Sequence, residues 1–187
     1  MKNTLFFFVF MECLFCYSPA DWLQNLSNQF IKKDFGLHLK YEVINGKELA
    51  GEKELNLFYH NLDSMVIETE TRKIVTHLNT WSVYDKKSNQ IFIDIPDQNL
   101  KKDISNIIDI IIERKYSIKK ILNSKMDLVV QKYNIPISIS MNGQNSIMVT
   151  AQFKDMKMTI NNMSIYKNNF NKASELPSNL NVIDFTK

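Results

Sequence analysis

The 187-residue chain has only two cysteines, Cys13 and Cys16, and both lie near its N-terminus. The remainder of the chain can therefore form no disulfide and offers no thiol nucleophile or thiolate metal ligand. Arginine is equally rare, because Arg72 and Arg114 are the two present, and lysine carries most of the net charge of +3. Arginine is the residue best suited to planar, bidentate recognition of phosphate, so this balance argues against nucleic-acid binding.

Histidine is also scarce, with His38, His60 and His77 as its three members. None has an acidic or histidine partner three or four residues away on a predicted helix, as a helical zinc site requires. A Gly-x-Ser-x-Gly elbow, a P-loop and a glycine-rich dinucleotide turn are absent too. Glu68 and Glu70 share a strand face, but such a pair is more typical of a solvated surface than of acid–base catalysis. The sequence predicts no enzyme, no cofactor and no metal site.

The N-terminus reads as a secretory signal peptide. A short basic start at Met1–Asn3 precedes the apolar run Thr4–Tyr17, and the small residues Ser18 and Ala20 stand at positions −3 and −1 of the predicted cleavage site. The apolar run is shorter than the roughly 20 residues that a membrane span needs. We therefore expect residues 1–20 to be removed and residues 21–187 to form a single domain.

Two other fates of the N-terminus remain open. The segment could be retained as a membrane anchor. Alternatively, Cys16 could be lipidated, which would tether the protein to a membrane. Lipidation needs a small residue before the cysteine, and Phe15 stands there.

Low glycine and proline content, four of each, goes with the absence of any linker or repeat. The most informative pattern in the chain is the alternation of apolar and polar residues. Met65–Pro96 reads as four short strands in which apolar and polar residues alternate. An amphipathic helix is predicted before it, at Asp21–Lys32 with Asp21 as its cap, followed by strands at Phe35–Val43 and Ala50–His60.

After Pro96 the pattern changes to helical spacing. Leu100, Ile104, Ile108 and Ile111 lie on one stripe of a helix that Asp97 or Asn99 could cap, and a short helix is predicted at Ile118–Asn123. Alternation then resumes around an Asn142-Gly143 turn. We predict a mainly β, α+β fold: an incomplete, half-open antiparallel barrel of roughly nine to eleven strands with helices over its mouth.

The apolar faces of this sheet and of the isoleucine-rich helix must meet. They either pack into an ordinary core or enclose a pocket for an apolar ligand. Alternation predicts which side chains would line such a pocket: Leu37, Leu39, Leu55, Leu57, Met65, Ile67, Ile93, Ile104, Ile108 and Ile111. A wrong choice of face reverses the assignment for a whole strand.

Two segments carry a resemblance to a known family. Ile74–Asp85 (IVTHLNTWSVYD), followed by Asn89-Gln90-Ile91, resembles the central valine-x-aspartate-glycine-x-threonine-leucine-tryptophan-x-tyrosine segment of the LolA-type periplasmic lipoprotein carriers. The closing segment Leu176–Asp184 is similar to that family's terminal proline-x-glycine-valine-x-valine-aspartate run. The chain departs from the pattern at Leu78, where the family has glycine, and its tryptophan is displaced by one position to Trp81.

The resemblance implies a function. Members of this family shelter the acyl chains of lipoproteins in a hydrophobic cavity while carrying them from the inner to the outer membrane of a diderm bacterium. It implies a monomer in the periplasm, loaded by an inner-membrane lipoprotein-releasing ABC transporter and unloaded at an outer-membrane acceptor or the membrane surface. The family's functional arginine has no counterpart in Phe58–Asp63.

Other hypotheses remain. The chain could be a tethered acceptor or insertase of the same fold, attached through Cys16. It could instead be a periplasmic sensor or scaffold domain with a filled core and no ligand. An envelope enzyme that uses His60 or His77 is the remaining alternative.

Overall fold

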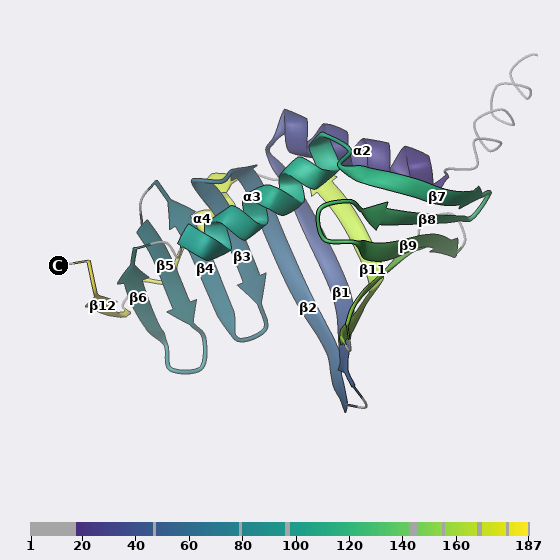
Figure 1. Cartoon of the computed structure of the whole chain (residues 1–187). Coiled ribbons are helices and arrows are strands. Elements are labelled where there is room, and N and C mark those ends of the chain that lie inside the picture. The colour runs from purple at the N-terminus through teal and green to yellow at the C-terminus, as the bar shows by residue number, and fades with distance from the viewer. Residues whose placement is uncertain are drawn as a thin grey trace, which may run out of the picture.

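The computed structural model describes residues 18–46, 48–78, 80–95, 98–142, 146–154, 156–167, 170–178 and 180–186. Within them the protein is mainly β. Twelve strands form one sheet that curls around two helices without closing into a barrel (Figure 1). The predicted fold class is confirmed, and the strand count exceeds the predicted range by one.

The elements follow one another in this order: α2 (Pro19–Lys32), β1 (Phe35–Asn45), β2 (Glu48–Asn61), β3 (Ser64–Thr69), β4 (Arg72–His77), β5 (Thr80–Asp85), β6 (Gln90–Asp94), α3 (Gln98–Ile112), β7 (Tyr116–Leu122), β8 (Lys125–Val130), β9 (Ile135–Asn142), β10 (Ser146–Phe153), β11 (Met156–Lys167), α4 (Phe170–Ser174) and β12 (Asn181–Asp184). The order across the sheet is β12-β6-β5-β4-β3-β2-β1-β11-β10-β9-β8-β7. The pairs are antiparallel apart from β12, which runs parallel to β6. The edges of the sheet are therefore β12 and β7.

Long strands form the middle of the sheet. β1 pairs with β2 on one side and with β11 on the other along nearly its whole length. The pairing register shifts between Lys40 and Tyr41 on one side and between Glu42 and Ile44 on the other. Such bulges bend a strand and increase its twist, which explains why the sheet curls here. The β1–β2 hairpin closes at Gly46, whose φ of 61° is one that glycine adopts without strain.

The four predicted strands of the meander are present as β3 to β6. Met65 and Val66, which are adjacent in β3, are both completely buried. Because neighbouring residues in a strand point to opposite faces, this burial requires that both faces of the sheet be covered at β3. The helices α2 and α3 lie over the concave face, and α4 contacts β2 and β3.

Helix α2 begins two residues before its predicted start. Ser18, and not Asp21, is its cap, and Pro19 occupies the first turn. The Ser18 hydroxyl accepts a hydrogen bond from the Asp21 backbone N–H, and the Asp21 carboxylate accepts from the Ser18 N–H, which forms a capping box. The predicted cleavage site after Ala20 thus falls inside the first turn of α2. The rest of the predicted signal peptide, residues 1–17, lies outside the described residues.

Two predictions around α3 need correction. The helix begins at Gln98, so Asn99 lies within it and is not its cap; Asp97 lies outside the described residues. The segment Ile118–Asn123 is not a helix, because its residues up to Leu122 belong to the strand β7. Pairing with β8, the other arm of the same hairpin, satisfies the backbone groups on one edge of β7 and overrides a weak local preference for helix.

The convex face carries a smaller second layer. Tyr166 lies over Gly36, where a β-carbon would come within 2.3 Å of the tyrosine ring. The Phe58 ring meets the same tyrosine edge to face, with ring centroids 6.1 Å apart. Beside them, Lys73 Nζ donates a hydrogen bond of 2.6 Å to the Glu175 carbonyl and fastens the segment after α4 to β4. Among the described helices, none has the length and apolar character that crossing a bilayer would require.

Candidate functional site

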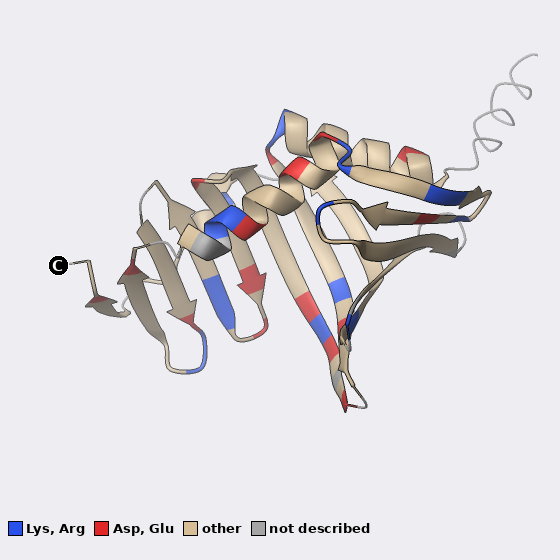
Figure 2. Ribbon diagram, in the orientation of Figure 1, with Lys and Arg blue, Asp and Glu red and all other residues tan. Residues whose placement is uncertain are grey.

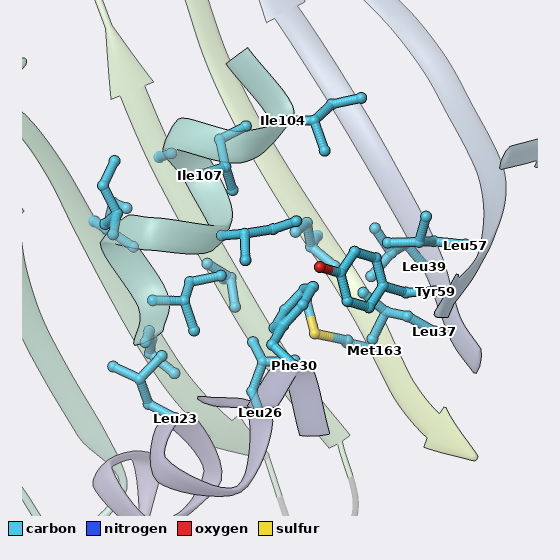
Figure 3. A pocket seen from close by; sticks show the side chains of 18 of the residues that line it. Leu23, Leu26, Phe30, Leu37, Leu39, Leu57, Tyr59, Ile104, Ile107 and Met163 are labelled. Carbon is cyan, nitrogen blue, oxygen red and sulfur yellow. The ribbon is translucent and has the colours of Figure 1, made fainter. Parts of the chain in front are cut away.

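A cavity of about 420 Å³ lies between the concave face of the sheet and the helices α2 and α3. Its walls come from both helices and from strands on both sides of β1, and the residues lining it are aliphatic or aromatic, as Figure 3 shows for part of them. Small-molecule sites commonly measure about 300 to 1,000 Å³, so the space suits an apolar ligand of small-molecule size. Sheet and helices therefore do not pack into a completely filled core.

The structure brings nine of the ten predicted cavity residues together around this one space. They come from three adjoining strands and from α3: Leu37, Leu39, Leu55, Leu57, Met65, Ile67, Ile104, Ile108 and Ile111. Cross-strand pairing accounts for their convergence, because Leu37 lies opposite Leu57 and Leu57 opposite Ile67, and paired residues point to the same face. The 3.6-residue period aligns the isoleucines of α3 on the helix face that meets them.

Ile93 lies outside the cavity, so its assignment was wrong. The pairing runs from Ile67 to Ile74, on to Val83 and then to Phe92, which places Phe92 on the cavity face. Ile93 alternates with Phe92 and therefore points to the convex face. In β6, where both faces carry apolar side chains, alternation cannot tell one face from the other.

The remaining wall was absent from the prediction. Most of it comes from α2 and from the strands β8 to β11, namely Trp22, Leu23, Leu26, Phe30, Leu128, Val130, Ile137, Ile139, Val149, Ala151, Ile160 and Met163. The signal was present in the sequence, since the helical stripe of α2 and the alternation of these strands both stand out. The missing information was which strands curl around to face β1 and β2.

Tyr59 is the most deeply buried tyrosine of the cavity wall, at 7% exposure. Its ring meets Phe30 edge to face, with centroids 5.2 Å apart, and lies 5.7 Å from the Phe35 ring. Burial, with a smaller contribution from the carboxylate of Asp109, raises the pKa of the Tyr59 hydroxyl above its ordinary value. The hydroxyl therefore stays neutral, and the wall of the cavity is uncharged at physiological pH.

Polar contacts hold α3 over the cavity at both ends. Near its start, Lys101 forms an ion pair with Asp63 in the turn between β2 and β3. Just beyond its end, Arg114 donates a hydrogen bond to the side-chain carbonyl of Gln24 on α2. The side chains between these contacts are apolar where they face the cavity. The helix is thus fixed by charged and polar groups at its ends and bears on the cavity only through apolar side chains.

Two of the histidines meet at a second, polar pocket away from the cavity. His60 and His77 line it together with Asp34 and Ser64. His60 Nδ1 and Asp34 Oδ1 are 2.6 Å apart, a partnership that sequence spacing does not reveal because 26 positions separate the residues. Among the described residues, no hydrogen bond joins Ser64 or His77 to His60.

Within the described ranges, no three His, Cys, Asp or Glu side chains gather closely enough to hold an ion. Nδ1 of the third histidine, His38, lies 2.8 Å from Oδ1 of Asn56. The apolar cavity is therefore the feature with the clearest chemical character.

Comparison with known proteins gives distant structural likeness. No family model and no curated protein matches the chain. Among solved structures, an uncharacterized conserved protein from Thermus thermophilus matches with a TM-score of 0.43 and 7% identity, over 88% of this chain and 98% of the other. A DUF1329 family protein from Desulfovibrio piger matches with a TM-score of 0.41 and 8% identity, over 78% and 90% of the two chains.

Proposed function

We propose that the chain is a periplasmic carrier that shelters the acyl chains of lipoproteins and moves them from the inner to the outer membrane. The observation that carries this proposal is the apolar cavity of about 420 Å³ under α2 and α3. The resemblance of Ile74–Asp85 and Leu176–Asp184 to the LolA-type carriers agrees with it.

The physics of acyl chains explains why such a cavity is useful. Each buried methylene gains about 0.8 kcal/mol, so a long acyl chain cannot cross an aqueous compartment exposed to water. A wall of aliphatic and aromatic side chains buries the acyl chain without directional contacts. It can therefore bind acyl chains whatever protein they are attached to. The carrier needs no nucleophile, metal or cofactor for this task.

A tethered acceptor is a second candidate, and the start of α2 favours it. Ser18 and Pro19 belong to the first turn of α2, and both would be lost by cleavage after Ala20. Processing at Cys16 would keep them and leave a lipidated cysteine two positions before the cap. Mass spectrometry of the mature N-terminus separates the two, because a free Asp21 start excludes the tether and an acylated Cys16 excludes the freely diffusing carrier.

The carrier itself is tested by extraction of lipoproteins from membranes. Purified protein is incubated with inner-membrane vesicles that contain a radiolabelled lipoprotein, under conditions that energise transport, and the label is followed into the soluble fraction. Leu55→Glu places a charge in the cavity wall, which costs several kcal/mol unless the group finds a partner. Leu49→Glu makes the same change on the same strand at a side chain that is 61% exposed.

We expect the unaltered chain and Leu49→Glu to bring labelled lipoprotein into the soluble fraction, and Leu55→Glu to bring at least tenfold less. Circular dichroism of each variant checks that the fold is retained. Equal extraction by both variants would contradict the proposal, as would no extraction by the unaltered chain.

A further inference from the structure

Strand β7 forms one edge of the sheet and is unusually apolar for an exposed strand. Its neighbour is β8 on one side, and its other edge has no strand partner among the described residues. Ile118, Ile121 and Leu122 are exposed to 48%, 55% and 49%. Large aliphatic side chains clustered on a free edge are an aggregation hazard unless the surface serves an interaction.

This apolar edge is continuous with the cavity wall. Tyr116, at the start of β7, lines the cavity together with Val130 and Leu128 of β8. Tyr116 pairs with Val130, and Ile118 pairs with Leu128, so Ile118 projects from the same face of the sheet as the cavity wall. Ile121, which pairs with the buried Met126, extends this apolar face toward the end of the strand.

The same edge is strongly basic. Residues 113–127 carry a net charge of +3, equal to that of the whole chain. Five of their side chains are basic: Arg114, Lys115, Lys119, Lys120 and Lys125. The two acidic ones, Glu113 and Asp127, form ion pairs with two of these lysines. The exposed Lys119 and Lys120 lie on β7, which contains no acidic residue and carries a short blue band in Figure 2, and Asp127 of β8 lies opposite Lys120.

We infer that the β7 edge, defined by Ile118, Lys119, Lys120, Ile121 and Leu122, docks on the surface of an anionic lipid bilayer. Its lysines meet the negative headgroups, and its aliphatic side chains enter the boundary between headgroups and acyl chains. This inference rests on the proposed function, because it identifies where an acyl chain passes between the membrane and the cavity.

The chemistry of the edge limits how deeply it enters. A free strand edge presents unpaired backbone N–H and C=O groups, which cannot be placed in hydrocarbon without a cost of several kcal/mol each. At headgroup depth water and lipid phosphates satisfy them. The positive charge also disfavours the other occupant of a free edge, a strand of a second copy, because lysines of like sign would then face one another.

Flotation with lipid vesicles tests the docking surface. The protein is mixed at low ionic strength with phosphatidylcholine vesicles that contain about one third phosphatidylglycerol, and with pure phosphatidylcholine vesicles as a reference. Lys119→Gln combined with Lys120→Gln removes two charges from the edge. Lys53→Gln combined with Lys87→Gln removes two exposed charges from β2 and from the β5–β6 turn, and is the matched control.

We expect binding to the anionic vesicles alone, weakened about fivefold by each lysine removed from β7 and about 25-fold by both. Binding should decrease as salt shortens the Debye length. Ile118→Ser with Ile121→Ser should weaken it as well, because the apolar contribution is lost. The control should bind within twofold of the unaltered protein.

Three results would overturn the inference. The first is no binding to anionic vesicles. Lys119 and Lys120 would then serve to prevent another strand from pairing with the free edge of β7. The second is equal weakening by the control, which reflects net charge alone. The third is association of the chain with itself through β7 in place of vesicle binding.

An apolar fluorescent probe that reports on the cavity is measured on the same samples. If the probe binds normally and the protein does not bind the vesicles, the docking role of the β7 edge is rejected and the proposed function is not. If the unaltered protein does not bind the probe, the proposed function is rejected, whatever the result of the flotation experiment.

Discussion

Replacing Ala151 with phenylalanine should shorten the longest acyl chain that the protein binds. Ala151 lines the cavity from β10 and is the smallest side chain of its wall. An engineered protein cavity of about 150 Å³ holds one benzene molecule. The cavity under α2 and α3, at about 420 Å³, is just under three times as large as that engineered cavity. It should therefore take about 17 carbon atoms, or one long acyl chain.

The added ring takes the space of one benzene and should leave room for about 11 carbons. Each methylene buried is worth about 0.8 kcal/mol, which is about fourfold in Kd. In the unaltered protein, Kd for a series of fatty acids should fall about fourfold per methylene up to about 17 carbons and then level off. In Ala151→Phe the levelling should begin near about 11 carbons, because longer chains no longer fit.

The assay is displacement of an apolar fluorescent probe by saturated fatty acids of increasing length. Gln152→Phe is the control, because it adds the same side chain at the next position of β10, where the side chain is exposed. Its profile should match that of the unaltered protein. A Kd that does not depend on chain length, or the same levelling point for Ala151→Phe and Gln152→Phe, would refute the reasoning.

Three further changes test how the site is built. In a chain that retains residues 18–20, Ser18→Ala should lower the free energy of unfolding by about 1 kcal/mol in urea titrations at pH 7, because α2 loses its cap. Hydrogen bonds from Ser18 hold the pKa of Asp21 below its ordinary value of 3.8, so their contribution is present above that pH and is lost as the pH falls through the lowered pKa. The difference between Ser18→Ala and the unaltered protein should therefore shrink in acid, and a constant difference would contradict this. Thr76→Val should cost about 1 to 3 kcal/mol of unfolding free energy, because the Thr76 hydroxyl accepts from the Met65 N–H at 2.8 Å in a completely buried position; a change below about 0.5 kcal/mol would show that another group replaces it. Tyr59→Phe should leave stability unchanged or raise it by up to about 1 kcal/mol, because it removes a polar group from an apolar wall. A clear loss of stability in Tyr59→Phe would mean that the hydroxyl has an important partner.

Local patterns were enough to predict the parts of the fold whose two faces differ. In β1 to β3 one face is apolar and the other mostly polar, so alternation identified Leu37, Leu57 and Ile67 as neighbours around one space. On α3, the 3.6-residue period placed Ile104 and Ile108 on the face that meets them. These predictions needed no knowledge of distant contacts.

Other features depend on which segments pair and on which face of a strand is covered, and the local pattern does not reveal this. A helix was predicted at Ile118–Asn123 because Ile118, Ile121 and Leu122 are apolar at helical spacing, and the strand form of β7 follows from pairing with β8. Ile93 was assigned to the wrong face because β6 is apolar on both sides. The contact of His60 with Asp34 likewise arises only when the end of β2 returns to the start of β1.

The content of the cavity in the cell tests the central claim most directly. The chain is purified without detergent from the cells that make it, the bound molecules are extracted into organic solvent, and mass spectrometry identifies them before and after protease treatment. The account predicts acyl chains of about 17 carbons that belong to lipoproteins and that are absent from Leu55→Glu purified in parallel. An empty cavity in the unaltered protein, or the same lipids in Leu55→Glu, would contradict it.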